Sequence, residues 1–567
     1  MDGCLTLSKQ SAPILEAKTH VTSETLNCLD KRTFAHHIAP FSLTAPVTTF
    51  ARTDHSTPMY MRARLYSTLF LLALTIAITT TADAQSKWRV NRALKPILAD
   101  DQLDHTWYGI LVVRPTDGKV LFERNANRYF MPASNTKLYT SAAALELLGP
   151  DYTYTTRLFA HGTQTDTLFA GDLVLVGDAD PTFLSPEYEP KPETLFAAWA
   201  DSLKAAGITR VSGDIIGDGR IIEDDALGYG WSWDDAPYYY AAEIGGLSAV
   251  ENSIQLRFGL TASDTAMQVV VAPIPAIDGY ATITATVSAT DGRPRRSYSR
   301  SLGGNDITLS ATVPPGYEDT VTVTIHDPAH FTAHLAKTYL TRAGITIDGE
   351  ARRATPADPI FHPQHPQRTQ DVALLQQVAS YQSVPMSDIV GRINKPSNNM
   401  HAEQVLRTIA RQDTTIAAPI GHWRRGWTGS RPLLEAAGID PDDFHLVDGS
   451  GLSRNNLVTP TQTGNLLRYM WAHPDTTLRR IYYDSLPISG TDGTIRNRMR
   501  APSPAFGVVR AKTGTLGSVS ALSGYVGPSQ EKSLIFVIMM NHFAGASSTA
   551  ARNKQDEIAA ALARLTQ

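Results

Sequence analysis

The stretch "YFMPASNTKLYTSAAALELLGP", residues 129–150, combines a helix with two chemically suggestive side chains. A turn of small residues leads into Ser134, and Lys137 follows three positions later. The helical run that comes next has apolar or small residues at Leu138, Ala142, Leu145 and Leu148. Gly149 and Pro150 are typical of the end of a helix. Because residues i and i+3 share a helix face, we expect Ser134 and Lys137 to touch at a helix N-terminus, where the dipole favours negative charge.

A second interpretation of Ser134 is that it merely opens a helix, since serine is common at that position. Ser-x-x-Lys is a short pattern, and it occurs again from Ser529 to Lys532 in "GPSQEKS". That second copy lies in a Gly-Pro turn between apolar runs with no helical pattern after it, so we expect a surface hairpin loop there. The rest of the sequence must therefore decide whether Ser134 is chemically active.

The composition is typical of a soluble globular protein. The 567 residues are 42% hydrophobic and 19% charged, with a formal net charge of −4. This nearly balanced charge makes neither nucleic acid nor an anionic surface an obvious partner.

The segment 61–85, "MRARLYSTLFLLALTIAITTTADAQ", has the three parts of a secretory signal. They are the basic residues Arg62 and Arg64, the apolar run Leu65–Ile78, and the small-residue site Ala82-Asp83-Ala84 before Gln85. The apolar run is shorter than the roughly 20 residues that span a bilayer, which favours a cleaved signal over a membrane anchor. We therefore predict export to the periplasm or cell envelope, with cleavage near Ala84-Gln85 and no stable membrane anchor.

Residues 1–60 precede this signal, although a signal belongs at the start of a chain. They are polar and without clear periodicity, and we interpret them as an over-long start assignment, with translation beginning at Met59 or Met61. Both cysteines, Cys4 and Cys28, fall in this part. An exported mature chain without cysteine depends on large hydrophobic cores, and its catalysis cannot use a thiol.

The mature chain, residues 85–567, is long enough for about three domains at roughly 150 residues each. Residues 88–150 have the pattern of a helix, two strands and the helix that begins near Ser134. From 151 to about 365, short strand-like runs alternate with Gly, Asp and Pro turns, and two helices are predicted near 192–206 and 328–343.

A Pro-rich stretch at 354–368 is typical of a linker. After it, the C-terminal part has both helical and strand-like patterns. Helices are predicted from 370 to 412, followed by a Gly-Ser-rich segment around 448–453, three strand-like runs and a C-terminal helix from about 548 to 566. Strands at both ends of the mature chain predict one α/β domain formed by residues 85–150 and 366–567. Residues 151–365 would then be a β-rich insertion of two domains.

A second candidate motif is Lys512-Thr513-Gly514-Thr515, in "VRAKTGTLGSVSALSGYVG". Neighbouring residues of a strand point to opposite faces, and a glycine leaves space for a ligand's backbone to approach the strand edge. The alternative is an ordinary edge strand with one exposed lysine.

A third candidate is Ser397-Asn398-Asn399, which precedes a helical pattern in "INKPSNNMHAEQVL". Alone it has little weight, because Ser453-Arg454-Asn455 matches the same Ser-x-Asn pattern and a polar helix cap is common.

Together, the three motifs occur in the order that is the signature of penicillin-binding proteins and serine β-lactamases. Four further stretches resemble the class C low-molecular-mass, type-4 penicillin-binding proteins, which are D-alanyl-D-alanine carboxypeptidases/endopeptidases; they are residues 171–183, 446–460, 486–499 and 511–526. The resemblance covers about residues 90 to 565. That family inserts two extra domains between the first two motifs, whereas β-lactamases have a much shorter interval. Asn398 is a mild departure, since the family often has Asp there.

The resemblance implies a multi-domain α/β (α+β) fold, in which β-rich domains are inserted between the first and second motifs of a penicillin-binding/serine β-lactamase-like transpeptidase domain. Ser134 would be the nucleophile and Lys137 its base, provided that burial and a nearby Lys512 cation keep Lys137 neutral. Ser397 would relay the proton toward the leaving amine, and Asn399 would hold Lys137 and a substrate amide.

The third motif would bind substrate. Lys512, Thr513 and Thr515, beside Gly514, would hold the C-terminal carboxylate of D-alanyl-D-alanine. The resemblance further implies an oxyanion hole formed by the N–H groups of Ser134 and Thr515. No metal or organic cofactor is required.

The sequence therefore predicts an exported serine D-Ala-D-Ala carboxypeptidase/DD-endopeptidase that hydrolyses peptidoglycan stem peptides through an acyl-enzyme and is acylated by β-lactam antibiotics. The alternatives are a serine β-lactamase and a non-catalytic receptor for cell-wall peptides or β-lactams. Other clusters are interpreted as structural: His326, His330 and His334 as a solvated helix start, and the C-terminal helix as a packed domain helix.

Overall fold

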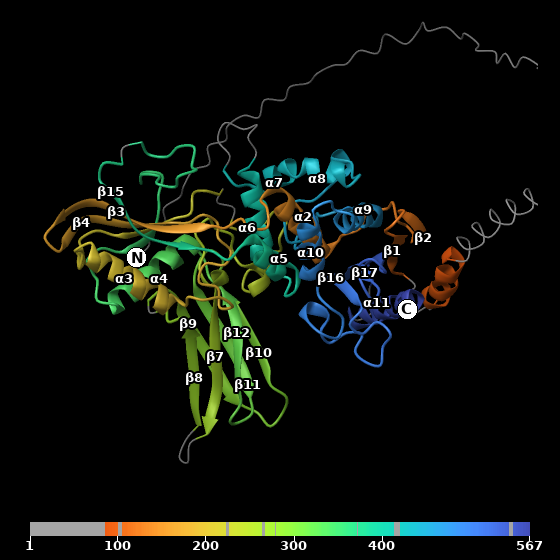
Figure 1. The fold of residues 1–567 in the computed structure, drawn as a ribbon. Coiled ribbons are helices and arrows are strands. Elements are labelled where there is room, and N and C mark those ends of the chain that lie inside the picture. The colour runs from red at the N-terminus through yellow and green to blue at the C-terminus, as the bar shows by residue number, and fades with distance from the viewer. Residues whose placement is uncertain are drawn as a thin grey trace, which may run out of the picture. The chain divides into compact units, whose positions relative to one another are not determined.

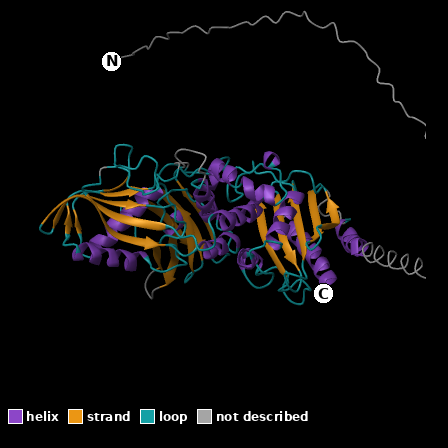
Figure 2. Cartoon of the chain, turned by 45° about the horizontal axis from the view of Figure 1, so that its top comes forward, coloured by secondary structure: helices purple, strands orange, loops and turns teal. Residues whose placement is uncertain are grey.

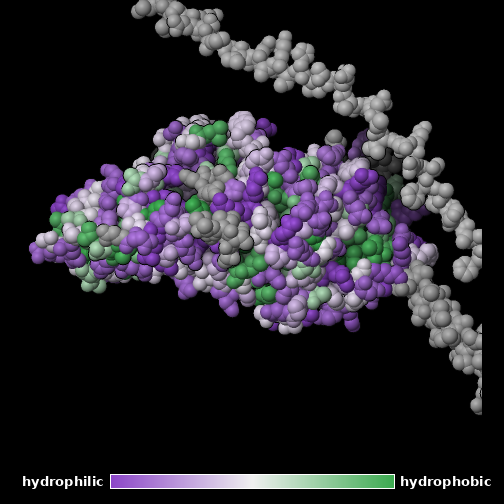
Figure 3. All heavy atoms as spheres, turned by 90° about the horizontal axis from the view of Figure 1, so that it is seen from above, coloured by the Kyte–Doolittle hydropathy of each residue, from purple (hydrophilic) through white to green (hydrophobic). Residues whose placement is uncertain are grey.

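The computed structural model describes residues 86–99, 105–222, 226–262, 267–277, 279–370, 372–412, 420–543 and 548–567. The predicted signal, the residues before it and both cysteines lie outside these ranges. Within them, no helix is long and apolar enough to cross a membrane. Hydrophilic residues cover most of the face drawn in Figure 3, and the hydrophobic residues on it form small, scattered groups.

A five-stranded sheet joins the two ends of the described chain, in the order β16-β17-β18-β1-β2 (Figures 1 and 2). Its strands are β1 (Trp107–Arg114), β2 (Lys119–Arg124), β16 (Val509–Leu516), β17 (Val519–Val526) and β18 (Leu534–Asn541). All neighbours pair antiparallel, and β1 pairs with β18 from Trp107↔Asn541 to Val113↔Ile535. The strands predicted at both ends of the mature chain thus form one sheet.

Both faces of this sheet are buried. Successive side chains of a strand point to opposite faces, so each strand contributes to two cores. On β1, Leu111 and Val113 pack into one hydrophobic core, while Ile110 and Val112 pack into another. The first core is covered by helices, which are α2 (Thr136–Leu147), α5 (Met386–Asn394), α6 (Asn399–Ala410), α7 (Trp423–Gly429), α8 (Arg431–Ala436), α9 (Pro460–Trp471) and α10 (Thr476–Ser485).

The second core is covered by a helix over residues 86–98 and by α11 (Ser548–Thr566). Ile558 and Leu562 of α11 are fully buried in it. The C-terminal helix is therefore packed against the sheet, as predicted.

The insertion contains a seven-stranded sheet and two smaller sheets. The large sheet consists of β3 (Thr155–Thr165), β4 (Leu168–Val176), β5 (Arg210–Val211), β6 (Ile215–Asp218), β13 (Thr346–Ile347), β14 (Ala351–Arg353) and β15 (Leu375–Gln382). Helices α3 (Pro192–Ala205) and α4 (Pro328–Arg342) pack on it, close to their predicted positions.

The two smaller sheets have three strands each. One contains β7 (Ser253–Ala262), β8 (Met267–Ile274) and β12 (Glu318–Thr324), and the other β9 (Thr282–Ala289), β10 (Arg295–Arg300) and β11 (Asp306–Val313). A continuous hydrophobic core joins all three sheets of the insertion, with Leu158, Phe258 and Leu309 among its buried residues.

The helices predicted from residue 370 onward are wrong at their start. Residues 375–382 form strand β15, which pairs antiparallel with β3 from Leu375↔His161 to Gln382↔Thr155. The sequence LQQVASYQ has no clean alternation, and its ladder contains a bulge between Gln377 and Ala379. The preference of a segment for a strand depends strongly on the strand that it packs against. Pairing with β3 therefore explains why residues 375–382 form a strand and not a helix. The sheet of the insertion therefore extends to Gln382, beyond the predicted boundary at 365.

Candidate active site

The first motif lies where a turn enters the helix α2. Ser134 is in a short 3₁₀ turn, Ala133–Asn135, and Lys137 is in the first turn of α2. The Nζ atom of Lys137 is 3.1 Å from the Ser134 hydroxyl oxygen. The contact predicted from the three-residue spacing is present.

Lys137 is completely buried and has two further acceptors. Its Nζ donates to the Asn399 side-chain oxygen and, at 2.6 Å, to the Ser450 carbonyl. Burial lowers the pKa of Lys137 to about 7, although the carboxylates of Asp448 and Glu403 act in the opposite direction. An amine with this pKa is neutral in a large part of the molecules at neutral pH, as a general base must be.

Two buried carboxylates hold the loop that carries Ser450. Glu403 on α6 accepts hydrogen bonds from the N–H groups of Gly449, at 3.0 Å, and Ser450, at 2.9 Å. Asp448 accepts from the N–H of Gly451 at 2.7 Å. These contacts aim the Ser450 carbonyl at Lys137.

The sequence analysis did not identify Glu403 and Asp448 as the residues that hold the Ser450 loop. The sequence contains a partial indication of their role. Glu403 is four residues after Asn399, so the two side chains share a face of α6. Asp448 begins the Asp-Gly-Ser-Gly run of the predicted Gly-Ser-rich segment. The contribution of a backbone carbonyl, such as that of Ser450, has no side-chain signature at all.

The second motif is at the start of α6. Ser397 has a left-handed backbone with φ +68°, and Asn398 is the N-cap residue. The Ser397 hydroxyl accepts a 2.8 Å hydrogen bond from Lys512 Nζ. Asn399 contacts Lys137 through its oxygen and donates through its nitrogen to the Tyr240 carbonyl at 2.6 Å. The predicted residues thus form two hydrogen-bonded groups, one of Ser134, Lys137 and Asn399 and the other of Ser397 and Lys512.

Lys512 lies on β16, at the edge of the five-stranded sheet, and is completely buried. Burial, together with the nearby Lys137, lowers its pKa well below the ordinary lysine value. The sequence predicted that Lys512 would help to lower the pKa of Lys137. In the structure burial is the largest cause of the lowered pKa of Lys137, and the charge of each lysine disfavours a charge on the other.

Gly514 lies close to the turn that carries Ser134. A Cβ atom at this position would be 2.5 Å from the Pro132 carbonyl oxygen and 3.1 Å from the Ser134 nitrogen. The glycine therefore makes room for the turn that carries Ser134, and its contact with a ligand's backbone stays a prediction. In both interpretations the glycine allows a backbone to approach closely. The sequence does not identify which backbone this is.

A cavity of about 580 Å³ opens over these motifs. Ser134, Ser397, Asn399, Thr513 and Thr515 line it. The insertion contributes a further part of the wall, namely Gly230, Ser232, Asp234, Asp235, Tyr239 and Tyr240. Thr513 also donates or accepts a 2.7 Å hydrogen bond with the hydroxyl of Thr494. The site is therefore a cleft with both domains in its wall.

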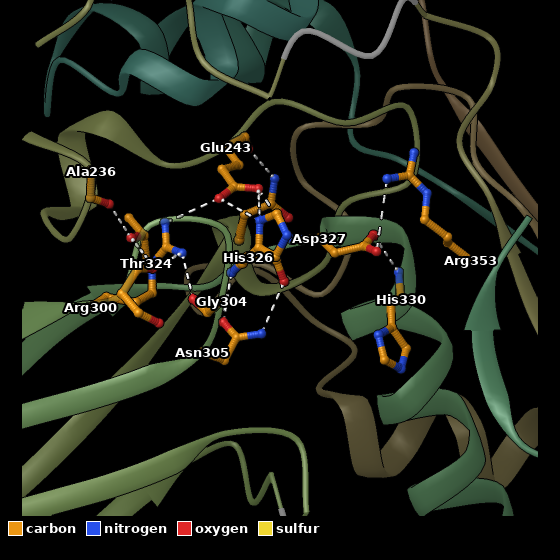
Figure 4. A network of polar contacts seen from close by, with 12 residues as sticks. Ala236, Glu243, Arg300, Gly304, Asn305, Thr324, His326, Asp327, His330 and Arg353 are labelled. Atoms are coloured by element: carbon orange, nitrogen blue, oxygen red, sulfur yellow. Dashed lines mark hydrogen bonds and ion pairs between the residues drawn. The ribbon is translucent and has the colours of Figure 1, made fainter. Parts of the chain in front are cut away.

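The three histidines near α4 are not a solvated helix start. His326 contacts the buried carboxylate of Glu243 through Nδ1 at 3.0 Å, as Figure 4 shows. The rings of His330 and His334 pack on the ring of Tyr280 at 5.1 and 5.2 Å between centroids. All three side chains are half-buried, so they are only partly solvated.

We predict that Gly514→Ala destabilises the protein by about 1–3 kcal/mol, because the methyl group overpacks against the Pro132 carbonyl. The control is Gly391→Ala on helix α5, where a Cβ meets nothing within 4 Å. That change should be neutral or stabilising, as alanine is preferred to glycine in a helix. Denaturant unfolding of both variants measures the difference; equal stabilities would contradict the close approach at Gly514.

The sequence profile of the D-Ala-D-Ala carboxypeptidase 3 (S13) family matches residues 90–565. The D-alanyl-D-alanine carboxypeptidase of Actinomadura sp. (strain R39) is 32% identical over 521 residues, which are 88% of this chain and 90% of the relative. The D-alanyl-D-alanine carboxypeptidase DacB of Haemophilus influenzae is 23% identical over 441 residues, 77% of this chain and 85% of that protein.

Solved structures confirm the fold class. Penicillin-binding protein 4 (dacB) of Haemophilus influenzae superposes with a TM-score of 0.67 at 20% identity, covering 84% of this chain and 98% of that one. A second structure of that protein, in complex with a β-lactam, gives a TM-score of 0.61. The fold is thus the expected multi-domain α/β arrangement. The match over residues 90–565 and the relative at 32% identity together establish that this chain is a peptidase of the D-Ala-D-Ala carboxypeptidase 3 (S13) family.

Proposed function

We propose that this chain is an exported serine D-Ala-D-Ala carboxypeptidase that also cuts D-Ala cross-links in peptidoglycan, acting through an acyl-enzyme on Ser134. The observation that carries the proposal is the position of Lys137, which is buried 3.1 Å from the Ser134 hydroxyl with its pKa lowered to about 7. Export rests on the sequence of residues 61–85.

The hydrogen bonds of Lys137 suit a neutral amine. Such an amine has two N–H groups and one lone pair. The Asn399 and Ser450 oxygens are carbonyl acceptors and take the two N–H groups. The lone pair is then left for the proton of the Ser134 hydroxyl, so the base is oriented before substrate arrives.

Acylation follows from this arrangement. The Ser134 oxygen attacks the carbonyl carbon of the penultimate D-Ala as its proton moves to Lys137. The resulting oxyanion would be stabilised by the N–H groups of Ser134 and Thr515, and one such donor is worth about 3 kcal/mol in a characterised protease. Both residues line the cavity.

Collapse of the tetrahedral intermediate breaks the C–N bond, and the departing amine needs a proton. The Ser397 hydroxyl, held by Lys512 Nζ at 2.8 Å, can supply it and recover the proton that Lys137 took from Ser134, which leaves Lys137 neutral again. The terminal D-Ala, or a cross-linked peptide bearing an amine, then leaves. Water attacks the ester with Lys137 again as base, and Ser134 and the carboxylic acid product are released.

Substrate recognition is assigned to the third motif. Thr513 and Thr515 lie on the cavity wall, and the Lys512 side chain next to them in strand β16 is completely buried. A carboxylate that enters the cavity favours the protonated form of Lys512 and so offsets the effect of burial on its pKa. β-Lactams carry such a carboxylate beside a reactive amide. We propose that they acylate the same serine.

The proposal is tested by incubating the mature protein with purified cross-linked muropeptides and, separately, with labelled penicillin. We expect release of D-Ala from pentapeptides or cleavage of the cross-links, and mass spectrometry should place the penicilloyl group on Ser134. Ser134→Ala should abolish both reactions and leave the thermal unfolding temperature almost unchanged.

Four results would redirect the proposal. Rapid turnover of penicillin without muropeptide cleavage would indicate a β-lactamase, and stable acylation without cleavage would indicate a receptor. Formation of dimers from monomeric muropeptides would indicate a transpeptidase. Labelling of the Ser134→Ala variant at the wild-type rate would remove Ser134 as the nucleophile.

A second prediction concerns Lys512. Lys512→Ala should slow acylation by substrates with a free C-terminal carboxylate at least tenfold more than acylation by the matching ester or amide, since a charge-assisted contact is worth about 1.5–3 kcal/mol. Stopped-flow acylation rates with both substrates measure the ratio. Equal losses with the two substrates would mean that Lys512 acts on the proton transfer and not on recognition.

A further inference from the structure

The insertion contacts the second motif through one continuous segment, residues 240–252. The Tyr240 carbonyl accepts from Asn399 at 2.6 Å, and the Gly245 carbonyl accepts from Gln404 at 2.7 Å. At the far end of the segment, Glu251 accepts a 3.0 Å hydrogen bond from the Asn398 side-chain nitrogen. The start of α6 is therefore held from the insertion at several points.

We propose that Glu251 is a positioning residue for the reaction: its carboxylate holds Asn398 and thereby fixes Ser397 and Asn399, which flank Asn398 in the chain. The inference rests on the proposed acylation of Ser134 and gives the insertion a direct part in it. Ser397 and Asn399 both line the catalytic cavity, whereas Glu251 does not. Glu251 therefore acts through Asn398 and not by contact with substrate.

The surroundings of Glu251 keep its carboxylate charged and in place. It accepts from the Ser185 hydroxyl at 2.9 Å, and His401 and Arg392 are 3.3 and 3.6 Å away. Burial alone would raise the pKa of Glu251, but His401, Arg392 and Ser185 outweigh burial and lower this pKa to about 2. An ionised carboxylate is a strong acceptor for the Asn398 amide.

The backbone at this point is strained. Val250, Glu251 and Asn252 have φ angles of 53°, 54° and 49°, so three successive non-glycine residues are left-handed. This conformation is a clear outlier for a β-branched residue such as Val250. Strain of this kind persists only where surrounding contacts hold the backbone in place. Strained residues are concentrated at functional sites.

The contacts that impose the strain come from the insertion itself. The Asn252 side chain donates to the Glu243 carbonyl at 2.7 Å and to the Ser248 hydroxyl at 2.9 Å. The Glu243 carboxylate is in turn fixed by Arg300 at 3.1 Å and His326 at 3.0 Å (Figure 4). The turn that carries Glu251 is thus anchored in the body of the insertion.

The same contact gives a physical reason for asparagine at position 398. The Asn398 oxygen caps α6 by accepting from the N–H of His401 at 3.1 Å, while its nitrogen donates to Glu251. Aspartate would cap the helix equally well, because both residues are good N-caps. It would, however, place a second carboxylate against Glu251. Asn398→Asp therefore tests the Glu251 contact with the helix cap preserved.

The experiment compares four variants of the full mature protein: Asn398→Asp, Glu251→Gln, the double variant, and Asn398→Asp combined with Glu350→Gln. Asn398→Asp should slow acylation by labelled penicillin about tenfold, as expected for coupled groups in contact. Adding Glu251→Gln should restore most of the rate, because the new glutamine amide can donate to the introduced aspartate and so replace the lost hydrogen bond. The loss should appear in the limiting rate and not in the half-saturating concentration.

Glu350→Gln is the matched control. It removes the same charge from the insertion at an exposed carboxylate that pairs with Lys337. It should not rescue Asn398→Asp. Rescue by Glu350→Gln, or additive losses in the double variant, would overturn the positioning role, and thermal unfolding of each variant separates a lost fold from a lost rate. If the wild-type protein is not acylated, both the proposed function and this inference are wrong. If the wild type is acylated but the rate losses in the double variant are additive, only this inference is wrong.

Discussion

The burial of the Lys137 amine is the constraint on which the site depends. A fully buried lysine cannot keep an unpaired charge without great cost, so it either finds a carboxylate or loses its proton. Here its direct partners are a hydroxyl and two carbonyl oxygens, while the carboxylates of Glu403 and Asp448 hold the loop behind them. Burial lowers the pKa of Lys137 to about 7, with its Nζ 3.1 Å from the Ser134 hydroxyl oxygen.

Each neighbouring element supplies one part of this environment. The 3₁₀ turn and helix α2 place Ser134 and Lys137 three residues apart, α6 contributes Asn399, and β16 lines the cavity with Thr513 and Thr515. The insertion holds the start of α6 through segment 240–252. A left-handed turn of non-glycine residues costs roughly 1–2 kcal/mol per residue. The fold bears this cost at the point where the insertion meets the second motif, which is consistent with a role in positioning.

The sequence was sufficient for the features that have a local period or motif. The Ser134–Lys137 contact follows from helix geometry, and the split sheet follows from strand patterns at both ends of the chain. Strand β15 was missed because its pairing with β3, and not its own residues, decides its conformation. The close approach of Gly514 to the Ser134 turn was not foreseen, because a glycine indicates close approach without identifying the partner. The Glu251–Asn398 contact joins residues 147 positions apart and has no pattern in one sequence.

The most direct test of the account is the titration of Lys137 itself. Lysine labelled with ¹³C at Cε gives a resonance that moves when the amine loses its proton, and comparison with Lys137→Ala identifies the signal. We predict a midpoint near pH 7, far below the ordinary lysine value of 10.5, with the neutral form dominant above it. A Lys137 signal that remains in the protonated form at pH 9 would contradict the account, because the buried amine would then not be available as the base for Ser134.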